Sequence, residues 1–198
     1  MSTATKSLAA IGVVLLVTAG SLVWVSQVVK RETVSAVVTL NPSGSAGKAL
    51  LVLHPGLSDF PDRIVAGFAD GLLQAGWRVD RTTASRQAPA DVKAYDLIVL
   101  ASPVYASAAA TPLRDYIARV GDFQGKPVVL LFTAAGDAAG ALDAAAATVA
   151  SAHGKVTGRF GYTSMRPNKS DKTYSGSNTD QAVAMARDAG RSLVVKSE

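Results

Sequence analysis

The feature that most constrains the fold is the segment 95–120, in which the pattern of apolar and polar residues changes twice. Residues 97–101 form an unbroken apolar run, which is typical of a strand buried on both faces of a parallel sheet. We expect that strand to end at Ser102 and Pro103, because proline fixes φ and restricts the residue before it. Residues 111–120 then show apolar side chains at helical spacing. Tyr105 is therefore predicted at the carboxyl end of a buried strand, where open α/β sheets bind ligands.

The rest of the chain from residue 48 repeats this alternation. Short apolar runs predict strands, and amphipathic stretches predict the helices between them. The predicted strands cover residues 49–53, 77–80, 97–101, 128–132 and 155–162, and the main helices begin near residues 59, 111, 138 and 180. This order predicts an α/β domain with five parallel strands and helices on both faces of the sheet.

A second kind of segment precedes this domain. Residues 8–29 contain no charged side chain and would span about 33 Å as a helix, which exceeds a bilayer core of about 30 Å. A cleaved signal peptide is the alternative, and its small-residue site would be residues 34–36. We expect residues 1–31 to be a tail with a single transmembrane anchor, 32–47 a turn-rich linker, and 48–198 the domain. The flanking basic residues favour a cytoplasmic side for the domain.

The composition excludes several kinds of site. The chain has no cysteine and two histidines, so disulfides, thiolate nucleophiles and cysteine–histidine metal sites are not expected. The net charge of +5 is mild and its charges are scattered, so we expect no nucleic-acid binding.

The run Tyr95-Asp96-Leu97-Ile98-Val99-Leu100-Ala101-Ser102-Pro103-Val104-Tyr105 resembles the third-strand signature of flavodoxins and related FMN reductases. The entry to the next strand, residues 123–127, and the loop 133–137 resemble the same family. The resemblance implies a flavodoxin-like doubly wound sheet with strand order 2-1-3-4-5. It also implies FMN as cofactor, held by the loops after the first, third and fourth strands.

The resemblance implies a set of cofactor-binding residues and no catalytic acid or base. An aromatic side chain stacks well on a flat flavin ring, which suits Tyr105, and small residues beside it allow backbone groups to approach. The predicted cofactor-binding residues are Ser58, Ser102, Pro103, Val104, Tyr105, Ala106, Thr133, Ala134 and Gly136.

The first loop departs from the family pattern. Flavodoxins have a hydroxyl-rich phosphate loop there, whereas residues 54–62 offer one hydroxyl, Ser58, with two prolines and two aspartates. Proline lacks an amide donor, and carboxylates repel a phosphate. We therefore expect a membrane-anchored flavoprotein that transfers electrons through FMN, with a redox partner protein or a quinone. The alternative is a non-enzymatic interaction domain on the same fold that has lost FMN.

Overall fold

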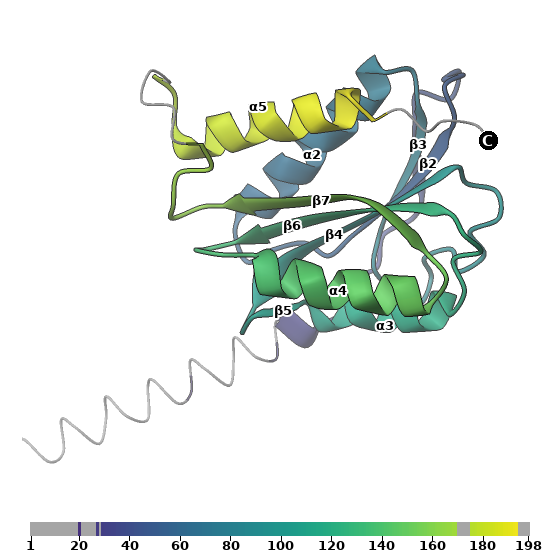
Figure 1. Ribbon diagram of the computed structural model, residues 1–198, viewed down its shortest axis with the longest axis horizontal. Coiled ribbons are helices and arrows are strands. Elements are labelled where there is room, and N and C mark those ends of the chain that lie inside the picture. The colour runs from purple at the N-terminus through teal and green to yellow at the C-terminus, as the bar shows by residue number, and fades with distance from the viewer. Residues whose placement is uncertain (1–19, 21–26, 28, 170–174, 194–198) are drawn as a thin grey trace, which may run out of the picture. The chain divides into compact units, whose positions relative to one another are not determined.

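The computed structural model describes residue 20, residue 27, residues 29–169 and residues 175–193. The chain divides into two compact units, Met1–Arg31 and Glu32–Glu198. In the second unit a central sheet separates two helical layers (Figure 1). The helices are α2 (Asp59–Gln74) and α5 (Asn178–Arg191) on one face, and α3 (Thr111–Val120) and α4 (Ala139–Ser151) on the other.

The sheet is mostly parallel. Its strands are β1 (Val38–Leu40), β2 (Lys48–Leu53), β3 (Arg78–Thr83), β4 (Leu97–Tyr105), β5 (Ala108–Ala109), β6 (Pro127–Ala134) and β7 (Lys155–Thr163). The spatial order is β1-β3-β2-β4-β6-β7, with β5 paired to β4. The five parallel strands thus follow the predicted order 2-1-3-4-5, while β1 and β5 add antiparallel pairs.

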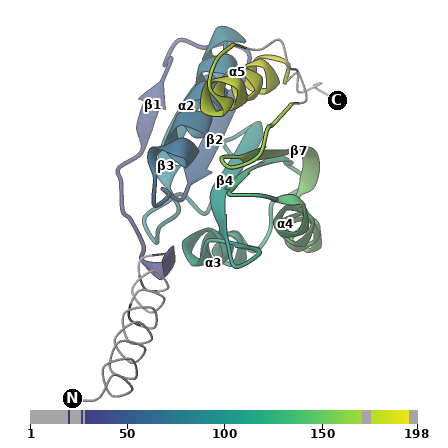
Figure 2. The same cartoon turned by 90° about the vertical axis from the view of Figure 1, so that its left-hand side faces the viewer.

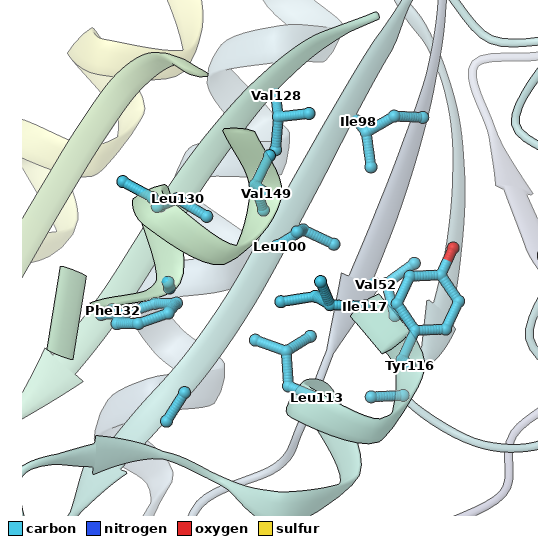
Figure 3. Close-up of a cluster of buried hydrophobic side chains, with 14 of the residues drawn as sticks. Val52, Ile98, Leu100, Leu113, Tyr116, Ile117, Val128, Leu130, Phe132 and Val149 are labelled. Atoms are coloured by element: carbon cyan, nitrogen blue, oxygen red, sulfur yellow. The ribbon is translucent and has the colours of Figure 1, made fainter. Parts of the chain in front are cut away.

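The unbroken apolar runs of the central strands follow from the two helical layers. Along β2, Leu50 and Val52 belong to the core under α3 and α4, whereas Leu51 and Leu53 belong to the core under α2 and α5. Figure 3 shows the first of these cores, in which strand residues meet side chains from α3 and α4. Because both faces are covered, neither face carries the polar residues that would produce alternation.

Two elements differ from the sequence-based expectation. β4 does not end at Ser102 and Pro103 but continues to Tyr105, because Val104 and Tyr105 pair with β5 in a hairpin. Proline's φ is compatible with extended backbone, so it does not break the strand. The segment 32–47, for which the sequence predicts a linker, contains β1 at the outer edge of the sheet beside β3 (Figure 2).

The predicted transmembrane segment, residues 8–29, falls almost entirely outside the described residues. In the part of the chain that the structure describes, no helix combines the length and apolar character needed to cross a membrane. The longest described helix, α2, has 16 residues, or about 24 Å against a bilayer core of about 30 Å. The predicted single-pass membrane localisation is wrong on this finding.

Candidate functional site

A pocket of about 200 Å³ lies where the carboxyl ends of β2, β4 and β6 converge. The register brings these ends together, because Leu53 pairs with Ala101 and Pro103 pairs with Thr133. The lining residues are Leu57, Ser58, Phe60, Pro61, Pro103, Val104, Tyr105, Thr133, Ala134, Ala135 and Ser164. We call this the Tyr105 pocket.

The pocket gathers many, but not all, of the residues predicted from the sequence. Six of them line it: Ser58, Pro103, Val104, Tyr105, Thr133 and Ala134. Ser102, Ala106 and Gly136 lie beside it without lining it. The lining residues that were not predicted from the sequence are Leu57, Phe60, Pro61, Ala135 and Ser164. Their only sequence signal is that they stand next to strand ends, or on the helix that follows one.

Tyr105 joins two sides of the pocket. Its hydroxyl accepts a hydrogen bond from the Leu57 backbone N–H at 3.0 Å, so the end of β4 is tied to the loop after β2. Burial raises the pKa of the Tyr105 phenol, and the Leu57 bond opposes this shift. The phenol therefore stays protonated near neutral pH, and the ring borders the pocket as a neutral aromatic surface.

The turn that presents Tyr105 has unusual backbone angles. Ala106 and Ser107 connect β4 to β5, and both have a positive φ: 47° for Ala106 and 64° for Ser107. Two-residue hairpin loops of type I′ need positive φ at both central positions, which is why Asn and Gly usually occupy them. Ala106 thus turns the chain directly after Tyr105, and its predicted contact with a cofactor stays a prediction.

Ser102 has a structural role in the β4–β5 hairpin. It is buried, its hydroxyl donates to the Pro103 carbonyl at 2.7 Å, and it accepts from the Ala110 N–H at 2.9 Å. These bonds hold the returning strand β5 and the start of α3 against β4. The protein thus uses the hydroxyl proton and one of the two acceptor lone pairs of Ser102.

Thr133 gives the clearest sign of a ligand. Its side chain is buried and lines the pocket, yet the hydroxyl has no hydrogen-bond partner. A buried polar group left unpaired costs about 1–3 kcal/mol, and a polar ligand atom in the pocket would remove that cost. His54 also has an unpartnered buried nitrogen, Nδ1, but it does not line the pocket. Burial lowers the pKa of its imidazole.

The apolar side of the pocket fits a flavin ring. Val104, Ala134 and Ala135 supply small apolar surfaces, Tyr105 supplies an aromatic edge, and Thr133 supplies a hydroxyl for a polar ring atom. Pockets that enclose a drug-sized ligand usually hold about 300–1,000 Å³. A ring in this smaller space would therefore remain partly exposed.

The phosphate side does not fit FMN. A Cβ added to Gly56 would lie 2.5 Å from Pro61 Cγ, so the proline ring packs directly against the bend of the loop. The Leu57 amide is already bound to Tyr105, and Pro55 and Pro61 have no amide hydrogen. Asp59 and Asp62 add two carboxylates in the first turn of α2. The predicted FMN site is thus supported only on its ring side.

Comparison with known proteins identifies the fold. No protein-family profile matches the chain, and no curated protein matches it by sequence. Among solved structures, the Flv1 flavodiiron core from Synechocystis sp. has a TM-score of 0.58 at 15% identity, over 76% of this chain and 36% of that chain. The chain thus spans about a third of that protein.

Two smaller proteins match along nearly their whole length. An NAD(P)H:quinone oxidoreductase from Methanothermobacter marburgensis has a TM-score of 0.55 at 15% identity, over 78% of this chain and 99% of that chain. A flavodoxin from Megasphaera elsdenii has a TM-score of 0.54 at 16% identity, over 70% of this chain and 98% of that chain. At these identities the likeness shows a common α/β flavodoxin-like fold.

Proposed function

We propose that the domain binds a flavin ring in the Tyr105 pocket and acts as a flavodoxin-type electron-transfer protein or oxidoreductase. The observation that carries this proposal is the buried, unpartnered Thr133 hydroxyl in a mainly apolar pocket bordered by Tyr105. The pocket also lies at the carboxyl ends of the parallel strands, where open α/β sheets bind ligands.

This chain would supply binding and tuning. A bound flavin supplies the capacity to accept and donate electrons. Tyr105 would cover the ring, Thr133 would donate to or accept from its polar edge, and Val104 and Ala134 would exclude water from one side. None of the lining side chains is an aspartate, glutamate, lysine, arginine or histidine, so protons would come from solvent. A redox partner protein or a quinone would serve as electron donor or acceptor.

A direct titration tests the proposal. Lumiflavin carries the ring without a sugar or phosphate, so it isolates the ring side of the site. We expect the purified full-length chain to quench lumiflavin fluorescence saturably and to shift its visible absorption. If lumiflavin and riboflavin both leave the protein unliganded, the proposal is wrong.

One observation favours a second function, a non-enzymatic interaction domain on the same fold. The loop after β2 is tightly packed at Gly56 by Pro61, and two exposed apolar side chains lie at the pocket: Leu57 lines it, and Met165 follows the lining residue Ser164. This alternative predicts that no flavin binds and that Leu57→Ser and Met165→Ser weaken association with a protein partner without changing the free energy of unfolding.

A further inference from the structure

We propose that the Tyr105 pocket selects a flavin without its 5′-phosphate, so that riboflavin binds more tightly than FMN. The proposal rests on the proposed flavin function and deepens it. Three properties of the loop between β2 and α2 carry it: its tight packing at Gly56, the backbone donors that remain, and the charge of the first helical turn. A fourth property, the neutral hydroxyls at the rim, favours an uncharged ligand tail.

The loop between β2 and α2 is tightly closed at Gly56. Gly56 stands at the bend of the loop, and a Cβ there would meet three atoms of the Pro61 ring at 2.5–3.2 Å. Pro61 is buried and belongs to the first turn of α2. The loop therefore packs tightly onto its own helix at Gly56 and has little freedom to widen around an added phosphate.

The donors that normally bind a phosphate at a helix N-terminus are reduced. Such sites rely on several backbone N–H groups aimed at one anion. Two of the residues here are prolines, Pro55 and Pro61, and contribute none. The Leu57 N–H is directed to the Tyr105 hydroxyl at 3.0 Å. The Leu57 N–H could bind a phosphate only if its bond to Tyr105 were broken.

The charge of the first turn opposes an anion. Asp59 and Asp62 both stand in it, and burial raises the pKa of Asp62, with Asp59 raising it further and Arg81 opposing. The adjacent cation, Arg63, is paired with Asp180 at 2.7 Å. Asp62 and Arg81 line a neighbouring cavity rather than the Tyr105 pocket, so the carboxylate beside this pocket is Asp59, which stands between the lining residues Ser58 and Phe60. A carboxylate close to a bound phosphate repels it and so weakens binding.

Neutral hydroxyls line the rim that a flavin side chain would follow. Ser58 is the N-cap of α2, but its side chain makes no capping hydrogen bond, so its hydroxyl is free to bond a ligand. Ser164 lines the same pocket from the end of β7. Hydroxyls both donate and accept, and they match the hydroxyl groups of a ribityl chain better than they match a phosphate.

The test compares ligands that differ in one group. Purified full-length chain is titrated separately with lumiflavin, riboflavin and FMN, and the dissociation constants are obtained from flavin fluorescence and from calorimetry. We expect riboflavin to bind at least about tenfold more tightly than FMN, a difference of about 1.4 kcal/mol. Lumiflavin should bind measurably, because the ring contacts are common to all three ligands.

Charge variants show whether the first turn causes the difference. In Asp59→Asn, Asp62→Asn and the double variant, FMN affinity should rise toward that of riboflavin, while riboflavin affinity stays within about twofold. Asp70→Asn is the matched control, because it removes the same charge from α2 about 12 Å further along the helix from Asp62. That distance exceeds the physiological Debye length of about 8 Å, so the affinity ratio should not change.

The outcomes separate the two proposals. FMN binding as tightly as riboflavin, or more tightly, overturns the inference and leaves the flavin function standing. Binding of none of the three ligands overturns both. A riboflavin preference that survives unchanged in the double aspartate variant contradicts the role of charge, and Pro61→Ala then tests the remaining steric cause by the same ratio.

Discussion

At the scale of single residues, Tyr105 combines two contacts that substitution can separate. Tyr105→Phe removes only the hydroxyl bound to Leu57, whereas Tyr105→Ala also removes the ring. Aromatic pairs contribute about 0.5–1.5 kcal/mol beyond burial, so we expect the alanine variant to bind lumiflavin up to about tenfold more weakly. The Tyr105→Phe variant should bind lumiflavin with nearly unchanged affinity, because it keeps the ring. Tyr95→Phe is the control, since the Tyr95 hydroxyl bonds Asp80 instead. Equal losses in the Tyr105→Ala and Tyr95→Phe variants would remove Tyr105 from the site.

Asp80 is a residue whose charge stabilises the fold. It is buried and accepts hydrogen bonds from Thr39 at 2.6 Å and Tyr95 at 3.1 Å, with Lys48 Nζ at 3.0 Å. Burial alone would raise the pKa of the Asp80 carboxyl, but these three partners outweigh burial and hold the pKa below its usual value of 3.8.

The direction of this shift fixes the pH dependence. A carboxyl whose folded pKa is depressed contributes stability that is present above the unfolded pKa and is lost as the pH falls through the folded pKa. We expect the free energy of unfolding in urea to decline below about pH 4, the region of the unfolded pKa. Asp80→Asn should lower it at pH 7 by about 1–3 kcal/mol and flatten this decline. If the free energy of unfolding of Asp80→Asn falls as much at low pH as that of the original chain, other carboxyls cause the pH dependence.

At the scale of elements, α2 and α5 approach so closely that glycine is required. A Cβ at Gly71 of α2 would lie 2.0 Å from the Arg187 carbonyl oxygen, and a Cβ at Gly190 of α5 would lie 2.2 Å from the Phe68 carbonyl oxygen. These are backbone atoms, which cannot turn aside as a side chain can. The contact therefore fixes α5 across the face of the sheet that carries α2 (Figure 1).

Gly71→Ala should consequently separate the two helices. We expect it to lower the free energy of unfolding by about 1–3 kcal/mol, as overpacking in a core does, and to increase amide hydrogen exchange in α5. Gly140→Ala in α4 is the matched control, because nothing lies within 4 Å of a Cβ there. That change should stabilise by about 0.4–1 kcal/mol. A stable Gly71→Ala variant would show that the helices can shift apart without cost.

The elements also show what the sequence could and could not predict. The apolar runs located β2, β4 and β6, because strands covered on both faces have no polar alternation. The small strand β1 gave no such signal: it has three residues, and Val38 is exposed. The β4–β5 hairpin was missed because Ala106 and Ser107 adopt positive φ without the glycine or asparagine that signals such a turn.

The candidate site divides in the same way. Tyr105 and Thr133 were predictable, since each stands where a buried parallel strand ends. The bonded state of Ser102 was not, because its partner is the Ala110 amide, which the hairpin brings back to β4. The position of the Pro61 ring against Gly56 was also unpredictable, since it depends on how the loop closes and not on residue type.

At the scale of the whole molecule, the N-terminal arm, residues 32–47, belongs to the compact unit Glu32–Glu198. Ser35 exchanges hydrogen bonds with Thr83: its N–H donates to Thr83 Oγ1 at 2.9 Å, and its Oγ accepts from the Thr83 N–H at 3.0 Å. The β1 strand covers the outer edge of β3. Gly47 packs on the Trp77 ring, which is buried.

Removing the arm should therefore affect stability and association together. We compare fragments 32–198 and 48–198. The shorter fragment loses the β1 ladder and uncovers Trp77, and we expect its free energy of unfolding to fall by about 2–4 kcal/mol. The shorter fragment should also self-associate as its concentration is raised, because the exposed edge of β3 presents unpaired backbone groups to another chain. Urea unfolding and size-exclusion chromatography measure the two effects.

Ser35→Ala in the longer fragment isolates the side-chain bond and should cost about 1 kcal/mol without association. If both fragments unfold at the same urea concentration and remain monomeric, the arm is an attached segment and the folded unit begins at Lys48. If only the shorter fragment loses stability and self-associates, the arm protects the edge of β3. Flavin titrations of a fragment then require the longer one.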